Sequence, residues 1–267
     1  MNSRVFEKMM RQFEVYKNVK VPNNMWIVLR LKGQRNKSYE EDLVVPFDSG
    51  VWDATVDATC SLMNTFNGVY AYCQLNEISI ALPRNTVMFG RRIEKLCSIA
   101  SAVTTGTALC LPVFDCSVLS MATNDEAINY FSWRLSDCKK NSLNRALSYA
   151  FLRSPDFEAI SNRYLSIKAL ADFMKGKKYR EKKVLLKNMY GVTFPDDFAD
   201  GFVYGASITW QDYVKPGIKP IPTGQKIDSI RGQLDVTSGY LVNNSEHREF
   251  VSQALDGSCG KIPVVNR

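Results

Sequence analysis

The chain has 267 residues, of which 45% are apolar and 23% charged, and it carries a net charge of +7 with an isoelectric point near 9.0. This composition can fill the core of one large domain, and no stretch approaches the roughly 20 continuous apolar residues of a membrane span. A single histidine, His247, and seven scattered cysteines without a Cys-x-x-Cys pair exclude serine–histidine triads and His/Cys zinc sites.

We therefore expect a cytoplasmic protein with no membrane partner, whose cysteines are reduced and mostly buried. A lone histidine near the C-terminus is expected at the surface, and we assign His247 no role.

Hydrophobic periodicity predicts the elements in chain order. They are an amphipathic helix within 1–18, a strand at 25–31, a helix at 49–66 capped by Asp48, two strands at 68–75 and 77–83 forming a hairpin with a tight Asn76–Glu77 connection, a long helix at 86–110, a strand at 112–121 and a long helix at 124–152. After residue 152 the pattern predicts helical stretches at 155–174 and 180–190 and a strand at 201–210, followed by a Pro/Gly-containing loop and a polar tail without an assigned element.

The order β-α-β-β-α-β predicts an α+β fold of the ferredoxin-like or polymerase-palm type, an antiparallel sheet with helices on one face. We expect a palm-like domain at 1–152 and, packed on it, a helical and basic extension at 153–267 with a C-terminal strand and tail. Proteins with this fold include RNA-binding platforms, polymerases and cyclases, so the fold alone does not decide the function.

Basic residues are concentrated in the segment "KGKKYREKKVLLKN", which has seven cations against the single acid Glu181. Clustered positive charge with an interleaved aromatic is typical of a nucleic-acid contact, and a solvated helix face is the alternative. The predicted RNA-binding residues are Arg35, Lys37, Lys175, Lys177, Lys178, Tyr179, Arg180, Lys182, Lys183 and Lys187.

Several segments in the right order resemble the tRNA-His guanylyltransferase family of 3′–5′ nucleotide-adding enzymes. They are "CQLNEIS", "FGRRIEKLCS", Phe114-Asp115, "NYFSWRLSDCKKNSLN" and "KGKKYREKKVLLKNMYGVTFPDDFADGF", and the resemblance covers roughly residues 10–205. It implies a polymerase-like palm, tRNA as a partner, assembly into a dimer or tetramer, and catalysis with two magnesium ions held by clustered carboxylates.

The resemblance fails at the carboxylates. The family's aspartate after the first strand aligns with Lys32, and its Asp-Glu pair aligns with Asn76-Glu77, so that only Glu77 is retained. A lysine cannot coordinate a metal, and its charge opposes dication binding by several kcal/mol at close range. The sequence therefore predicts no metal site, with Glu77 as a weak candidate ligand. We expect Lys32 either to pair with Glu77 or to point to solvent.

Other positions in the resembling motifs retain polar side chains suited to phosphate. The nucleotide- or phosphate-binding candidates are Arg91, Arg92, Lys95 and Ser98 on the second long helix and Arg134 and Asn141 on the third. A solvated face with structural ion pairs is the alternative. Trp133 is expected to pack in the core, with base stacking as the alternative. Asp115 and Asp137 are possible replacement metal ligands, although Asp137 is expected instead to pair with a neighbouring arginine.

These observations favour an RNA-binding protein, for tRNA or mRNA, with a guanylyltransferase-like palm that has lost two-metal nucleotidyl transfer and needs no cofactor. One alternative is an active tRNA-His guanylyltransferase-like or tRNA-repair enzyme, which would require magnesium and GTP or ATP. A second is a structural or assembly protein that keeps the fold for oligomerisation.

Overall fold

The computed structural model describes residues 3–34, 46–108, 113–152, 172–215, 229–238 and 244–258. Within them the strands are β1 (Trp26–Gly33), β2 (Tyr70–Gln74), β3 (Glu77–Leu82), β4 (Phe114–Met121), β5 (Ala206–Lys215) and β6 (Ser229–Ser238). The helices of the same ranges are α1 (Ser3–Arg11), α3 (Ser49–Phe66), α4 (Ile93–Thr107), α5 (Asn124–Leu152), α8 (Tyr179–Tyr190), α9 (Asp200–Tyr204) and α10 (Asn244–Leu255), with short 3-10 helices η1 (Val15–Asn18) and η2 (Met88–Arg91).

The strands form one antiparallel sheet in the order β4-β1-β3-β2-β5-β6. Its first four strands have the ferredoxin-like order, with α3 connecting β1 to β2 and α4 connecting β3 to β4. The predicted α+β palm is therefore confirmed, but the prediction of helices on one face is wrong, because α5 and α10 pack on the face opposite to α3 and α4. The sheet continues past the palm, because β5 pairs with β2 and β6 pairs with β5.

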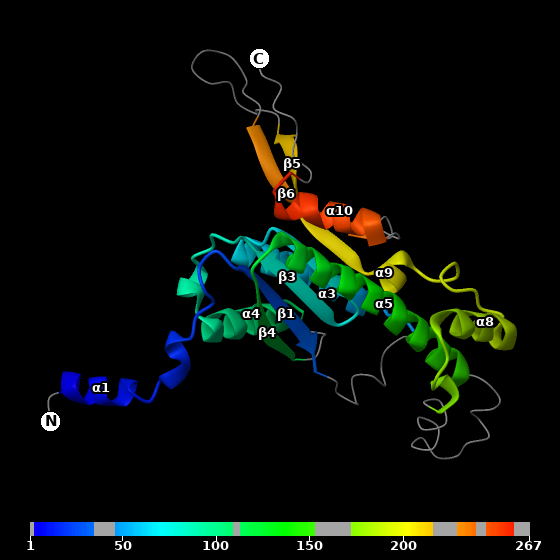
Figure 1. Cartoon of the computed structure of the whole chain (residues 1–267), viewed down its shortest axis with the longest axis horizontal. Helices are drawn as coiled ribbons and strands as arrows, with labels where there is room; N and C mark the ends of the chain where they lie inside the picture. The colour runs from blue at the N-terminus through cyan, green and yellow to red at the C-terminus, as the bar shows by residue number, and fades with distance from the viewer. Residues whose placement is uncertain are drawn as a thin grey trace, which may run out of the picture.

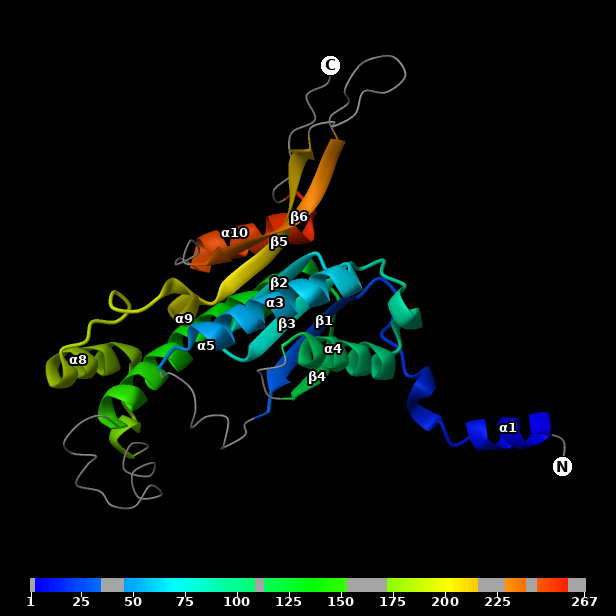
Figure 2. The same cartoon turned by 180° about the vertical axis from the view of Figure 1, so that it is seen from behind.

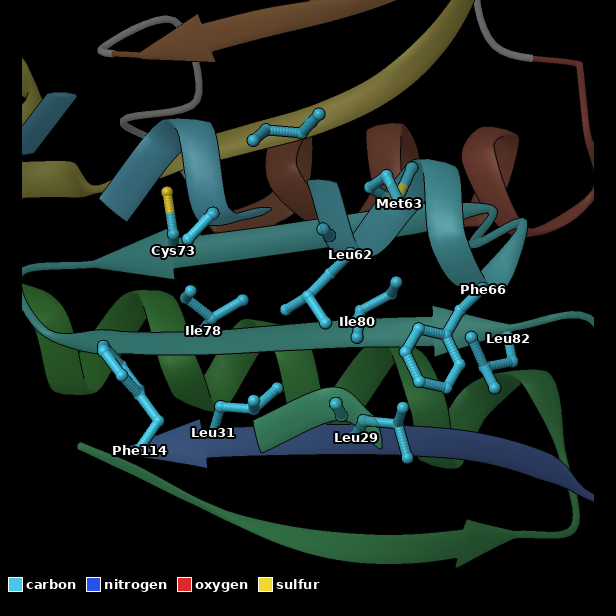
Figure 3. Close-up of a cluster of buried hydrophobic side chains, with 14 of the residues drawn as sticks. Leu29, Leu31, Leu62, Met63, Phe66, Cys73, Ile78, Ile80, Leu82 and Phe114 are labelled. Carbon is cyan, nitrogen blue, oxygen red and sulfur yellow. The ribbon is translucent and has the colours of Figure 1, made fainter. Parts of the chain in front are cut away.

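One face of the sheet packs against α3 and α4 (Figure 2). Alternate residues of each strand point to this side, where they meet apolar side chains of the two helices (Figure 3). The central members are Leu29, Leu31, Leu62, Met63, Phe66, Ile78, Ile80 and Leu82, all fully buried. The predicted bounds of α3 and its cap are correct, since Asp48 Oδ1 accepts a hydrogen bond from the Val51 amide at 3.0 Å.

The opposite face carries the other residues of each strand and is covered by α5 and α10 (Figure 1). Tyr70 and Tyr72 of β2 pack there against Phe131 and Leu135 of α5 and Val251 of α10. Beyond the sheet, α5 continues to a third apolar cluster that it shares with α8 and α9. The helix α5 thus links the palm to the basic segment.

In three stretches the type of element differs from the sequence prediction. The stretch predicted as one helix from 86 begins instead with η2, whose Phe89, Gly90 and Arg91 have positive φ, and the α-helix starts at Ile93. The strand predicted from 201 begins as the helix α9 and becomes β5 only at Ala206. The polar tail contains β6 and α10, for which no element was predicted.

Histidine and cysteine burial also differ from expectation. His247 lies on α10 against the sheet and is 1% exposed, so its predicted surface location is wrong. Of the described cysteines, which are free thiols, Cys73 and Cys138 are buried and the other three are partly exposed.

Candidate functional site

Lys32 lies near the end of β1, between two carboxylates of the neighbouring strands. Its cross-strand partner is Glu77 in β3 on one side and Asp115 in β4 on the other. Directly paired residues of antiparallel strands share a face, so these three side chains belong to the α5 side of the sheet. Lys32 and Asp115 are exposed, whereas Glu77 is buried.

Two arginines hold the Glu77 carboxylate. Arg30, two residues before Lys32 on the same strand face, donates from Nε to Oε1 at 2.9 Å and from Nη2 to Oε2 at 3.1 Å. Arg134 of α5 approaches Oε1 with Nη2 at 2.6 Å. The bond to Glu77 raises the pKa of Arg30 above its ordinary value. Among the described residues Glu77 thus pairs with Arg30 and Arg134 and not with Lys32, so the predicted Lys32–Glu77 ion pair is wrong.

The ion network continues along α5. Arg134 Nη2 also donates to Asp137 Oδ2 at 2.9 Å, and Asn141 Nδ2 donates to the same oxygen at 3.0 Å. The expectation that Asp137 pairs with a neighbouring arginine is confirmed. Arg134 is 1% exposed, and its Nε and Nη1 have no hydrogen-bond partner among the described residues. Two guanidinium groups and two carboxylates balance each other in this network.

Trp133 lies beside the network and is 48% exposed, so its predicted place in the core is wrong. The guanidinium carbon of Arg134 is 4.4 Å from the centroid of its ring, and that of Arg30 is 5.4 Å away. The Tyr130 ring contacts it edge-on with the centroids 5.8 Å apart. An aromatic ring is therefore held in place next to the arginines and left open to solvent on part of its surface.

The donor set of this site does not fit two magnesium ions. Both oxygens of Glu77 accept from arginine, and Lys32 offers no lone pair. The Asn76 side chain makes a long contact, 3.4 Å from Nδ2 to the Gly33 carbonyl, while its backbone carbonyl accepts a hydrogen bond from the Gly33 amide at 2.9 Å. Within the described ranges, no group of three His, Cys, Asp or Glu side chains could hold a metal ion.

Arg91 is a structural residue and not a phosphate ligand. It is 4% exposed, and its guanidinium donates to the backbone carbonyls of Val21, Pro22, Met25, Arg84 and Thr86 at 2.7–3.1 Å. It therefore joins the chain before β1 to the chain after β3. Arg91 is the last residue of η2 and lies outside α4, and its five guanidinium N–H groups are all used by backbone carbonyls, which argues against its predicted role as a phosphate ligand.

The other candidates of that group lie apart from Glu77. Arg92 precedes α4, and Lys95 and Ser98 lie on α4, where the Ser98 hydroxyl donates to the Lys95 carbonyl at 3.4 Å. Since α4 covers the face opposite to α5, these residues and the Arg134–Asn141 pair are on different sides of the sheet. The structure does not bring the two predicted phosphate-binding sets together.

The basic segment includes the start of α8, which packs against α5 in the third apolar cluster, and some of its cations contact other residues. Lys182 Nζ donates to Asn144 Oδ1 at 2.7 Å, and Lys177 Nζ contacts the Phe173 carbonyl and lies 4.5 Å from its ring centroid. Tyr179 packs edge-on against Phe194. The cations that are exposed are Lys175, Lys178, Arg180 and Lys187, with Lys183 half-buried. The candidates Arg35 and Lys37 lie outside the described residues.

Sequence reasoning missed Arg30 and the exposure of Trp133. A signal for Arg30 was present, because a cation within an apolar strand, two residues before Lys32, must share its face. Trp133 carried no such signal, since exposure depends on which side of α5 meets the sheet.

Residues 7–122 match the protein-family model for tRNAHis guanylyltransferase. The tRNA(His) guanylyltransferase of Neurospora crassa is 24% identical over 94% of this chain and 98% of its own length. The probable tRNA(His) guanylyltransferases of Drosophila melanogaster and Homo sapiens are 24% and 27% identical over 64% and 48% of this chain. Those two matches span 62% and 48% of the relatives' own lengths.

Solved structures with similar folds come from the same group of proteins. The tRNA(His) guanylyltransferase from Saccharomyces cerevisiae superposes with a TM-score of 0.64 at 20% identity, covering 75% of this chain and 91% of that one. A bacterial tRNA(His) guanylyltransferase-like protein in complex with ATP gives 0.69 at 20% identity, covering 94% and 98%. A bacterial tRNA(His) guanylyltransferase-like protein in complex with GTP superposes with a TM-score of 0.64 at 21% identity, covering 95% of this chain and 99% of that one. These similarities show the fold. In the described part of the chain no helix is long and apolar enough to cross a membrane.

Proposed function

We propose that this chain, which belongs to the tRNA-His guanylyltransferase family, binds RNA and that its palm does not perform two-metal nucleotidyl transfer. The observation that carries the proposal is the pairing of Glu77 with Arg30 and Arg134. A carboxylate that would face a dication is bound by two fixed cations, and Lys32 adds a third positive charge at the same end of the sheet.

Electrostatics favours this interpretation over a weakened metal site. Each positively charged side chain within about 4 Å of Mg²⁺ opposes binding by about 8 kcal/mol at an effective dielectric constant of 20, because the ion carries two charges. Arginine is also suited to RNA, because its planar fork binds phosphate oxygens and its face stacks on bases. The site thus exchanges metal chemistry for phosphate and base contacts.

RNA is the partner because the charge and the family agree. The chain has 34 Lys and Arg against 27 Asp and Glu, and exposed cations gather at α8. The matched relatives are named for tRNA. We also predict that the protein is cytoplasmic and forms a homo-oligomer, either a dimer or a tetramer. Light scattering on the purified chain measures the oligomeric state.

The test measures RNA binding and nucleotide addition side by side. Labelled GTP and Mg²⁺ are incubated with a tRNA substrate, with the Neurospora crassa enzyme as the positive control, and RNA affinity is measured by anisotropy across a salt series. We expect salt-sensitive binding without incorporation. Incorporation above background refutes the proposal, and loss of both activities would favour an assembly role.

A matched set of variants tests the electrostatic reason. Lys32→Asp with Asn76→Asp restores two carboxylates beside Glu77, so Mg²⁺ affinity measured by calorimetry should rise above that of the wild type. Adding Arg30→Gln should raise it further, because Arg30 then no longer binds Glu77 Oε2. If neither variant binds Mg²⁺ better than the wild type, the charge argument fails.

The second candidate function is nucleotide addition itself, favoured by the two similar structures that hold ATP and GTP. For this chain it would require the Asn76 carbonyl and Glu77 to hold magnesium, with Arg30 and Arg134 displaced. The incorporation assay distinguishes the two candidates directly.

A further inference from the structure

Trp133 is exposed in a place where its neighbours are buried. The residue after it, Arg134, is 1% exposed, and Tyr130 one turn before it is 7% exposed, whereas Trp133 is 48% exposed. Burying a large exposed apolar ring is favourable, so a ligand that covers Trp133 lowers the free energy of the complex.

The ring is also held rigidly. Arg134 lies 4.4 Å from its centroid and is itself fixed by Glu77 and Asp137, while Tyr130 contacts it edge-on and donates to or accepts from Ser79 Oγ at 2.8 Å. A ligand that stacks on Trp133 therefore loses little free energy in ordering the ring. Cations beside an aromatic platform, as Arg30 and Arg134 are here, are the groups that accompany base stacking in single-strand binding sites.

A track of polar side chains, one of them acidic and one basic, leads away from this ring along α5. Positions four, seven and eleven residues after Trp133 share its side of the helix, and they are Asp137, Lys140 and Asn144. Asp137 has its charge paired with Arg134, Lys140 is exposed, and Asn144 contacts Lys182 of α8. Eleven residues at 1.5 Å each put about 16 Å between the ring and the start of the basic helix.

We propose that Trp133 stacks the terminal base of a single-stranded RNA end, and that the phosphates of the same strand follow α5 past Lys140 to the exposed cations of α8. The proposal rests on the proposed RNA-binding function and names its ligand class. A single-stranded end is proposed because its terminal base can rotate freely onto the ring, whereas a base inside a duplex is stacked on both faces and a terminal base pair is held in place by its partner strand.

The experiment compares short single-stranded RNAs that differ at one terminal nucleotide. Fluorescence anisotropy measures the affinity of wild-type protein for an oligonucleotide with purines at both ends, for the same oligonucleotide with an abasic site at each end in turn, and for a blunt duplex. We expect one terminal abasic site to lower affinity by about 5- to 150-fold, the range of a single base–aromatic stack.

Variants assign the effect to the ring. Trp133→Leu should lose the same factor for the purine-ended RNA and nothing for the abasic one, and Trp133→Phe should recover part of it. Tyr16→Leu, at a 78% exposed aromatic before β1, is the matched control and should leave affinity unchanged. Reversing Arg180 and Lys187 should reduce the slope of log affinity against log salt by about one per residue.

The outcomes separate the two proposals. If wild-type protein binds RNA but does not distinguish purine from abasic ends, the stacking proposal is overturned and RNA binding stands. If wild-type protein binds none of the RNAs, both proposals fail. The comparison of RNAs uses wild-type protein, so it decides the matter even if a Trp133 variant does not fold.

Discussion

Arg134 offers the sharpest test of the ion network, because its contribution depends on burial and not on contact distance. We expect Arg134→Met to lower the free energy of unfolding by about 3 kcal/mol, since it leaves the buried Glu77 with only part of its compensation. The expected loss is at the lower end of the range for a broken buried pair, because Arg30 still holds both oxygens of Glu77.

The matched control is Arg11→Met. Arg11 and Glu7 have the same 2.6 Å separation between nitrogen and oxygen as Arg134 and Glu77, but their side chains are 61% and 58% exposed. A solvent-exposed pair of this kind contributes about 0.5 kcal/mol. Burial is the principal difference between the two pairs, so the two variants isolate it.

The assay is urea unfolding of both variants with a thermal melt in parallel. At about 2 to 4 °C per kcal/mol for a chain of this size, Arg134→Met should melt about 6 to 12 °C below the wild type, and Arg11→Met within about 2 °C of it. Combining Arg134→Met with Glu77→Gln should give a coupling energy above about 1 kcal/mol. Equal losses for the two arginines would refute the reasoning.

Three further predictions concern the scaffold. Arg91→Met should cost at least about 3 kcal/mol in urea unfolding, because five carbonyls lose a charged donor, whereas Arg92→Met should cost less than about 1 kcal/mol. Burial lowers the pKa of His247 to about 4, so as the pH falls below about 6.5 the unfolded chain binds a proton that the folded chain does not. The free energy of unfolding should therefore decline by about 3 kcal/mol between pH 6.5 and pH 4. His247→Gln should remove this decline when unfolding is compared across the same pH range. Gly205→Ala should cost at least about 2 kcal/mol in thermal melts, since φ is +69° and the added Cβ would lie 2.5 Å from the Cys73 carbonyl oxygen; no loss would contradict this.

The palm could be predicted from sequence because its elements have strong local signals. The helix α3 begins after a capping aspartate and repeats apolar residues at helical spacing, and the strands are short apolar runs separated by turns. The order of these elements then restricts the topology to few choices. The local signals of β6 and α10 are weaker, and the side of each element that is buried is recognised only once its packing partners are known.

The errors arise where distant parts of the chain meet. Arg91 looked like a helical cation, but carbonyls of the chain before β1 lie around it and hold it outside the helix. His247 looked like a surface residue, but α10 packs it onto β2, where Nε2 lies 3.2 Å from the Tyr70 hydroxyl. Local patterns contain no information about such partners, because each depends on contacts far along the chain.

The candidate site shows the same division between local and distant information. The resemblance to the family predicted that Lys32 and Asn76 stand where its members have carboxylates, and this was sufficient to question metal binding. It did not show which cation would compensate Glu77, because Lys32 and Arg30 both lie on that side of the sheet and Arg134 arrives from another element.

The geometry explains why an arginine pairs with Glu77 and the lysine does not. Arg30 pairs with Ser79 of β3, two residue pairs further into the sheet than Lys32 and Glu77. Its long planar side chain reaches Glu77 diagonally and donates from Nε and Nη2. Lys32 stands directly opposite Glu77 at the exposed end of the strand, where water solvates its ammonium group at no cost in burial. One carboxylate is thereby neutralised from inside the protein, and the lysine at the rim stays exposed.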